Sequence, residues 1–176
     1  MSYFICNQTD IETKLKSLTE TGTSEDGWTQ YYLDKTNDEI WHSTKYGSEY
    51  HGGGVTVLKR LPPLTMDQLI NIALTSIDLS DITGASRELY EREEFQKENF
   101  RSELIQKLES FDLCSLSSFD KERLKTIIYE SSLFDSANRR EIVGKHWTEI
   151  NKDAEYFTDI ASRTKLILND IEKYSS

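Results

Sequence analysis

The chain has 176 residues, of which 36% are hydrophobic, 30% charged and 11% aromatic. This length suits one compact domain, or a small domain with a helical extension, and the aromatic content argues against disorder. The net charge of −10 disfavours direct binding of nucleic acid, because phosphates attract Lys and Arg, and it favours a basic protein partner.

The N-terminal region predicts one short strand and one helix. Residues Tyr3–Cys6 have the composition of a strand. Residues Thr9–Thr21 predict a helix, with Thr9 or Asp10 as the N-cap. Its apolar residues recur on one helical face: Ile11, Leu15 and Leu18. Gly22 then stands where a C-terminal glycine of the helix is expected.

The stretch from Gly27 to Leu61 predicts a three-stranded antiparallel meander. Aromatic and β-branched residues gather in three runs, which a polar turn at 34–39 and a triple glycine separate: Trp28–Leu33, Ile40–Tyr46 and Val55–Leu58. Neither face of the first two runs is purely apolar, so the sequence leaves the register open. Pro62 and Pro63 end the sheet region, because proline cannot donate to a central ladder.

The chain after residue 64 follows a helical pattern. Thr65 and Gln68 form a capping box that begins a predicted helix over Met66–Ile77. Apolar residues at helical spacing predict two more helices, over Ser86–Phe111 and over Ser117–Phe134.

The last helix is predicted over Asn138–Tyr174, and only Gly144 interrupts its pattern. Its apolar stripe steps by three and four residues: Trp147, Ile150, Ala154, Phe157, Ala161, Thr164, Leu168 and Ile171. We expect this stripe to form the core of a helical bundle. A seam between two chains is the alternative.

These patterns together predict an α+β fold. A small antiparallel meander of about three strands, over residues 27–61, packs with helices. A mostly α-helical C-terminal two-thirds follows it. The predicted division is an α+β region at residues 1–63 and a helical region at residues 64–176, unless the two form one continuous compact domain.

Targeting and redox features predict a cytoplasmic protein. Cys6 and Cys114 are too few and too far apart for a metal cluster or a disulfide framework, so free thiols are expected. The N-terminal segment lacks the basic residues and the apolar stretch of a signal peptide. No segment approaches the ~18 consecutive apolar residues of a membrane span.

The segment His51-Gly52-Gly53-Gly54 invites a catalytic interpretation. An esterase oxyanion loop of this kind needs a G-x-S-x-G nucleophile elbow, which the sequence lacks. Glycines that bind a phosphate would have to open a helix, whereas a β-branched run follows these. The favoured interpretation is structural, with Gly52, Gly53 and Gly54 allowing positive φ or a bulge between strands.

A metal-dependent hydrolase is the enzymatic alternative, with His51, Glu49 and Asp34 as its site. Histidine and carboxylate ligands suit zinc, and His42 and Glu39 lie nearby in the sequence. The spacing of these residues matches no known metal-binding signature. No metal and no cofactor is therefore expected.

Aromatic rings and carboxylates of the meander have the composition of a protein-binding surface, with rings at the centre and charges around them. The rings and acids concerned are Trp28, Tyr31, Tyr32, Trp41, Tyr46 and Tyr50, with Asp34, Asp38, Glu39 and Glu49.

The same residues resemble the bacterial polymorphic-toxin immunity family numbered twenty-seven. The resemblance lies in Gly27-Trp28-x-x-Tyr31-Tyr32-x-Asp34, Glu39-x-Trp41 and Ser48-Glu49-Tyr50-His51-Gly52-Gly53-Gly54. It covers residues 8–61, including the helix before the first strand. Two positions depart from the family pattern: Asn37-Asp38 stands where the family has Gly in the hairpin turn, and Val55 where it has Pro.

The resemblance implies a non-enzymatic immunity protein of the cytoplasm that binds and neutralises a cognate toxin domain. The acidic charge adds the expectation of a basic toxin, such as a nuclease. The residues expected to contact it are Tyr31, Asp34, Asp38, Glu39, Trp41, Glu49 and His51. Neither nucleic acid nor a membrane is expected to bind. The remaining alternative is a helical scaffold or regulator, in which Asn138–Tyr174 pairs with another chain.

Overall fold

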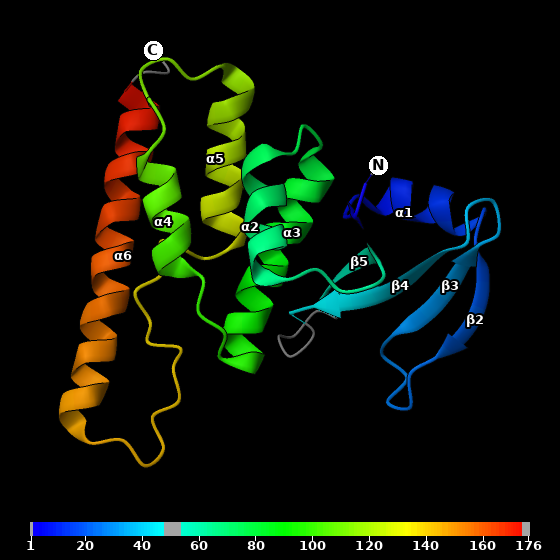
Figure 1. Cartoon of the computed structure of the whole chain (residues 1–176), viewed down its shortest axis with the longest axis horizontal. Coiled ribbons are helices and arrows are strands. Elements are labelled where there is room, and N and C mark those ends of the chain that lie inside the picture. The colour runs from blue at the N-terminus through cyan, green and yellow to red at the C-terminus, as the bar shows by residue number, and fades with distance from the viewer. Residues whose placement is uncertain (1, 48–53, 174–176) are drawn as a thin grey trace. The chain divides into compact units, whose positions relative to one another are not determined.

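The computed structural model describes residues 2–47 and 54–173, and the chain forms two compact units, Met1–Ala85 and Ser86–Ser176 (Figure 1). The first unit is built on a β-sheet and the second is helical, which confirms the predicted α+β fold class. The division predicted after residue 63 stays a prediction, since compactness alone does not show which parts fold independently. Within the described ranges, no helix is both long and apolar enough to cross a membrane.

The sheet of the first unit is antiparallel throughout, in the order β1-β5-β4-β3-β2. The described residues contribute five strands: β1 (Phe4–Ile5), β2 (Thr19–Thr23), β3 (Gln30–Asp34), β4 (Glu39–Tyr46) and β5 (Val55–Arg60). The predicted meander is confirmed as β3, β4 and β5, and the predicted N-terminal strand is β1. The sequence pattern does not predict β2.

The first helix, α1 (Gln8–Leu15), begins one residue before its predicted start at Thr9. Its N-cap is Asn7, whose side-chain oxygen accepts the backbone N–H groups of Thr9 at 2.9 Å and Asp10 at 3.3 Å. Both predicted caps therefore lie inside the helix. Asn7, two positions before Thr9, satisfies the free amide groups of the first turn equally well.

The predicted helix over Thr9–Thr21 is wrong beyond Leu15, because the chain turns and forms β2. Gly22 pairs with Tyr31 of β3, and the register shifts between Glu20 and Gly22. Gly22 is thus part of a strand and does not cap a helix. Threonine is a good strand former, and pairing with β3 decides the conformation of this segment.

One face of the sheet is covered by α1. The register places Tyr32 of β3 opposite Trp41 of β4, and their side chains share this face with Leu58 of β5. These three side chains and Ile11 of α1 form a core cluster in which each is at most 8% exposed. Burial of these large apolar groups stabilises the packing of α1 on the sheet.

The opposite face is packed against α3 (Leu79–Glu91) at the β1 end of the sheet. Phe4 is 3% exposed and lies so close to Gly84 that a Cβ at position 84 would come within 2.3 Å of its ring. The Oδ1 atom of Asp81 accepts the backbone N–H groups of Tyr3 at 2.6 Å and Phe4 at 2.8 Å. The edge strand β1 is therefore fixed to α3.

The loop from Leu61 to Leu64 leads into α2 (Met66–Thr75), which confirms the helix predicted to start at Met66. The predicted capping box is present: Thr65 Oγ1 accepts the N–H of Gln68 at 3.3 Å, and Gln68 Oε1 accepts the N–H of Thr65 at 2.8 Å. β5 ends at Arg60, as the prolines predict, and the Leu61–Pro62 peptide bond is cis. The buried face of α2 consists of Leu69, Ile70 and Ala73.

In the described part of the second unit, three α-helices follow the end of α3. A short π-helical turn, η1 (Arg92–Gln96), precedes them, and the helices are α4 (Arg101–Glu109), α5 (Ser118–Glu130) and α6 (Trp147–Lys173). The helix predicted over Ser86–Phe111 is interrupted, because Lys97 has φ +59 and the chain reverses there before α4. The start predicted for α5 is confirmed, with Ser117 as its N-cap.

This interruption brings together a buried ion pair. Arg101 is 0% exposed and Glu93 is 4% exposed, and a guanidinium nitrogen lies 2.8 Å from the carboxylate. Arg101 also donates to the carbonyl of Asp135 at 3.0 Å and lies over the ring of Phe157 at 4.9 Å. A charge without exposure to water needs such partners, so this pair links η1, α4 and the chain before α6.

The last helix begins at Trp147, so the prediction that it starts at Asn138 is wrong. Gly144 has φ +79 and lies in a turn that precedes the helix. Lys145 Nζ lies 2.7 Å from the carboxylate of Asp153, which also pairs with Arg140. These ion pairs hold the segment against α6 in a non-helical conformation.

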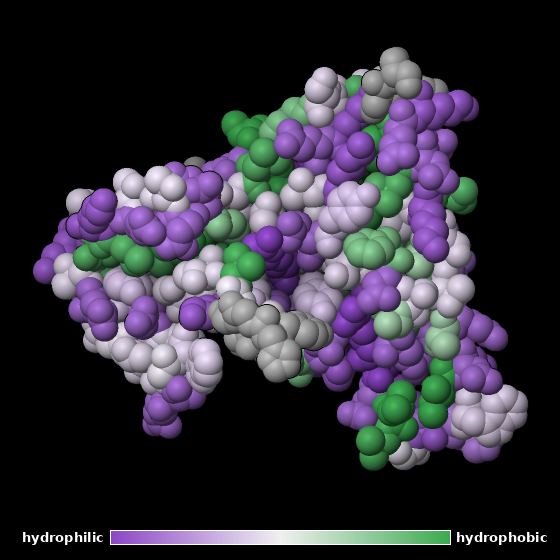
Figure 2. Space-filling view, turned by 180° about the vertical axis from the view of Figure 1, so that it is seen from behind, coloured by the Kyte–Doolittle hydropathy of each residue, from purple (hydrophilic) through white to green (hydrophobic). Residues whose placement is uncertain are grey.

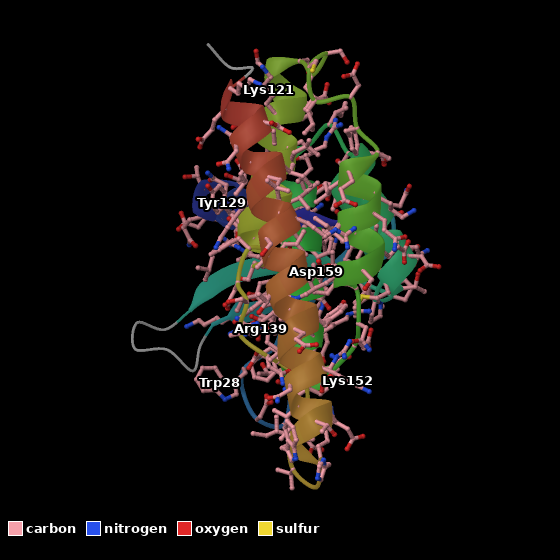
Figure 3. The ribbon with its side chains drawn as sticks, turned by 90° about the vertical axis from the view of Figure 1, so that its left-hand side faces the viewer. Trp28, Lys121, Tyr129, Arg139, Lys152 and Asp159 are labelled. Atoms are coloured by element: carbon pink, nitrogen blue, oxygen red, sulfur yellow. The ribbon has the colours of Figure 1, made fainter. Side chains whose placement is uncertain are left out.

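From Phe157 onward, every residue of the predicted stripe except the half-buried Leu168 is confirmed in the core face of α6. Phe157, Ala161, Thr164 and Ile171 are all buried within the second unit. The prediction that Trp147 is a core residue is wrong, since this residue is 64% exposed. The outer face of the helix carries Lys152 and Asp159 (Figure 3).

Candidate partner-binding surface

Two of the residues predicted to contact a partner are buried parts of the first unit. Asp34, at the end of β3, is 4% exposed; one carboxylate oxygen accepts a hydrogen bond from Lys14 at 2.6 Å, and the other accepts the Thr36 hydroxyl and N–H. The hydrogen bond from Lys14, followed by those from Thr36, lowers the pKa of Asp34 to about 2. This carboxylate therefore links α1 to the turn between β3 and β4.

Trp41 is likewise a packing residue in this structure. Its side chain is 3% exposed in the cluster under α1, and Lys14 Nζ lies 5.1 Å from the centroid of its ring. A partner that meets the surface of the sheet unit cannot reach this ring. The strand alternation of the sequence does not reveal this, because either face of β4 could have been the covered one.

Tyr31 lies on the other face of the sheet, where it stacks on His42 of β4. Their ring centroids are 6.1 Å apart and their planes differ by 8°. The register places Leu33 and Ile40 beside this pair, on the same face. Ile40 is 46% exposed and the other three side chains are half-buried, so the four form a partly apolar surface strip.

Asp38 and Glu39 line a groove at the end of this strip. The groove has a volume of about 740 Å³, and its walls come from four parts of the first unit: Tyr3, residues 38–40, residues 60–64 and Gln68. Ile40 belongs both to the strip and to the groove, so the two are continuous. We refer to the strip and the groove together as the strip–groove surface.

The groove carries one ion pair, between Arg60 and Glu39, and one separate carboxylate, that of Asp38. Arg60 Nη1 lies 2.7 Å from Glu39 Oε1, and the Arg60 guanidinium lies over the ring of Tyr3 at 4.1 Å. Asp38 is exposed, has φ +57, and makes no hydrogen bond or ion pair with any residue in the ranges 2–47 and 54–173. The groove therefore has one neutralised ion pair and one carboxylate open to solvent.

Four predicted positions, Glu49, His51, Gly52 and Gly53, lie outside the described residues. Gly54 is described and has φ +69 immediately before β5. Across residues 2–47 and 54–173, no three His, Cys, Asp or Glu side chains are grouped as a metal site would require. Asp34, the described member of the alternative metal site, would have to give up its bonds to Lys14 and Thr36 to bind a metal.

The sequence patterns do not mark several groove residues as part of a binding surface: Tyr3, Arg60, the prolines and Gln68. The proline pair marks the end of the sheet and Gln68 marks a helix cap, so each already had a local explanation. Only the fold shows that these residues meet Asp38 and Glu39.

Residues 7–62 match the model of the family described as Immunity protein 27. This segment contains 56 of the 176 residues and includes α1 and strands β2 to β5. The match confirms the resemblance over this part of the chain. Comparisons with curated proteins and with solved structures found no match.

Proposed function

We propose that this chain is a non-enzymatic immunity protein that binds and neutralises a cognate bacterial toxin domain in the cytoplasm. The observation that carries the proposal is the match of residues 7–62 to the immunity family. The matched segment contains most of the strip–groove surface, including Tyr31, Asp38 and Ile40.

The toxin is proposed to be basic, as a nuclease is. The net charge of −10 supports this, because an acidic protein attracts a basic partner and rejects acidic ones. A nuclease carries cationic side chains where it contacts phosphates, and a carboxylate-bearing inhibitor can occupy the same side chains.

Co-expression tests the proposal. The toxin domain encoded beside this gene is induced in a bacterial host with and without this protein. Growth should be restored only when the protein is present, and the two proteins should purify together at low salt. If the host dies in both cases while both proteins are made, the proposal fails.

A second candidate function is pairing of the helical unit with another chain. A patch at the start of α6 supports it: Ile142 is 53%, Val143 83% and Trp147 64% exposed. Figure 2 shows apolar surface at its lower right, over the loop before α6 and the first turn of that helix. The Glu141 carboxylate accepts the N–H groups of Ile142 and Val143, at 2.9 and 3.0 Å, and so holds this loop in shape.

Light scattering on the purified protein tests this second candidate. A dimer that becomes a monomer in a Val143→Ser, Trp147→Ser double variant supports pairing through the patch. A wild-type protein that is monomeric at all concentrations excludes self-pairing.

A further inference from the structure

We propose that the groove at Asp38 receives a cationic side chain of the toxin, an arginine or a lysine, together with the apolar residues next to it. This inference rests on the proposed immunity function and names the chemistry that the groove recognises.

The walls of the groove are mostly apolar and rigid. Its apolar lining includes Ile40 of β4 and the loop Leu61–Leu64, which contains two prolines. Proline has a fixed φ, so this loop loses little conformational entropy when a partner binds. A volume of about 740 Å³ accommodates several side chains and lies within the usual range of ligand-binding clefts.

The electrostatics of the groove select a cation. Arg60 is the cationic residue among those that line it, and its charge is already compensated by Glu39 at 2.7 Å and by the face of Tyr3. An anionic group entering the groove would therefore meet no uncompensated cation in its described lining. The exposed carboxylate of Asp38 offers a cation an open partner, and the aliphatic stem of arginine or lysine can lie on the apolar walls.

The position of Asp38 is set by the backbone. Its φ of +57 places it in the left-handed region, which aspartate and asparagine adopt more readily than most residues. An Asp38→Asn variant therefore removes the charge and keeps the conformation of the turn. This property makes the substitution a clean test of the carboxylate.

The test measures the affinity of the full-length protein for the toxin domain encoded beside its gene, by calorimetry at several salt concentrations. Asp38→Asn should weaken binding about tenfold or more and should reduce the dependence of affinity on salt. Ile40→Thr, which keeps a β-branched residue on the strand, should also weaken binding about tenfold through the lost apolar contact. Circular dichroism checks that both variants are folded.

Glu25→Gln is the matched control. Glu25 is exposed on the same unit, makes no interaction with any described residue, and its loss changes the net charge by the same amount. If Asp38→Asn and Ile40→Thr bind as tightly as Glu25→Gln, the groove is not the binding site, and the immunity function stands. If the wild-type protein itself does not bind the toxin, the immunity function fails.

Discussion

At Gly84, a single added methyl group would clash with the packing of the first unit. A Cβ built at this residue of α3 would lie 2.3 Å from Cγ, 2.4 Å from Cβ and 2.5 Å from Cδ1 of Phe4. Relief of the contact to an ordinary separation requires a shift of about 1 Å. Phe4 cannot shift freely, because its N–H is bonded to Asp81 and its strand pairs with β5.

The Gly84→Ala substitution should therefore lower the free energy of unfolding. Overpacking of a rigid contact costs about 1–3 kcal/mol, and the upper end applies because the nearest atoms belong to a buried ring and its Cβ. Alanine in a helix recovers about 1 kcal/mol relative to glycine. The net loss should be about 2 kcal/mol, out of a total stability of about 5–15 kcal/mol for a typical domain.

Urea unfolding, followed by circular dichroism, measures this change. The Gly22→Ala variant is the control, because nothing lies within 4 Å of a Cβ at Gly22 and its φ is not positive. A Phe4→Gly substitution, which removes the Cβ together with the ring, should make Gly84→Ala much less costly, as a double-mutant cycle would show. A Gly84→Ala protein more stable than the wild type would refute the close contact between β1 and α3.

Three further predictions concern residues whose roles the structure separates. In urea unfolding, Trp41→Phe should destabilise the protein by at least ~1 kcal/mol, because Trp41 is buried. Trp28→Ala should change stability by less than ~0.5 kcal/mol, because Trp28 is 61% exposed (Figure 3). Equal effects of the two substitutions would contradict the assigned core. The folded-state pKa of Asp34, about 2, lies below the ~3.9 of an unfolded aspartate, so its ionised form contributes stability above about pH 4 that is lost as the pH falls to about 2. Asp34→Asn should therefore be less stable than the wild type at pH 6, and acid titration of both should show the difference vanishing near pH 2; a constant difference would contradict this. Glu93→Gln should lower stability by about 3–5 kcal/mol in the same urea assay, because it leaves Arg101 buried without its counter-charge; a loss below ~1 kcal/mol would show that water reaches this arginine.

Much of the fold could be predicted from local patterns. Strands β3, β4 and β5 contain aromatic and β-branched runs. The N-cap of α2 is predictable because Thr65 and its capping-box partner, Gln68, are only three residues apart. Strand β2 could not be predicted in this way. Its residues, Thr19–Thr23, are all exposed, so they show no apolar alternation, and their pairing with β3 is what makes them a strand.

The start of α6 cannot be predicted from local patterns for a similar reason. Residues 138–146 have no proline and a composition that a helix tolerates, so local propensity continues the helix through them. Arg140 and Lys145 instead pair with Asp153 of α6, and Gly144 adopts positive φ. Contacts of this kind join residues 8 to 13 positions apart, which periodicity does not detect.

The candidate surface was predictable only in part. Tyr31, Asp38 and Glu39 lie on the strip–groove surface, and the family resemblance and the acidic turn both led to them. Trp41 and Asp34 are an aromatic ring and a carboxylate, like the other residues of the predicted surface. However, α1 covers Trp41, and Lys14 of α1 binds the carboxylate of Asp34. Arg60 joins the groove from the far end of β5, and only the sheet register brings it beside Glu39.

The most direct measurement of the central claim is a titration of toxin activity with the purified protein. The toxin domain encoded beside this gene is assayed, for a nuclease by cleavage of labelled nucleic acid, while the protein is added in increasing amounts. An immunity protein should abolish activity at one equivalent at low salt, and more protein should be needed as the salt concentration rises. Full toxin activity in the presence of excess folded protein at low salt would contradict the account.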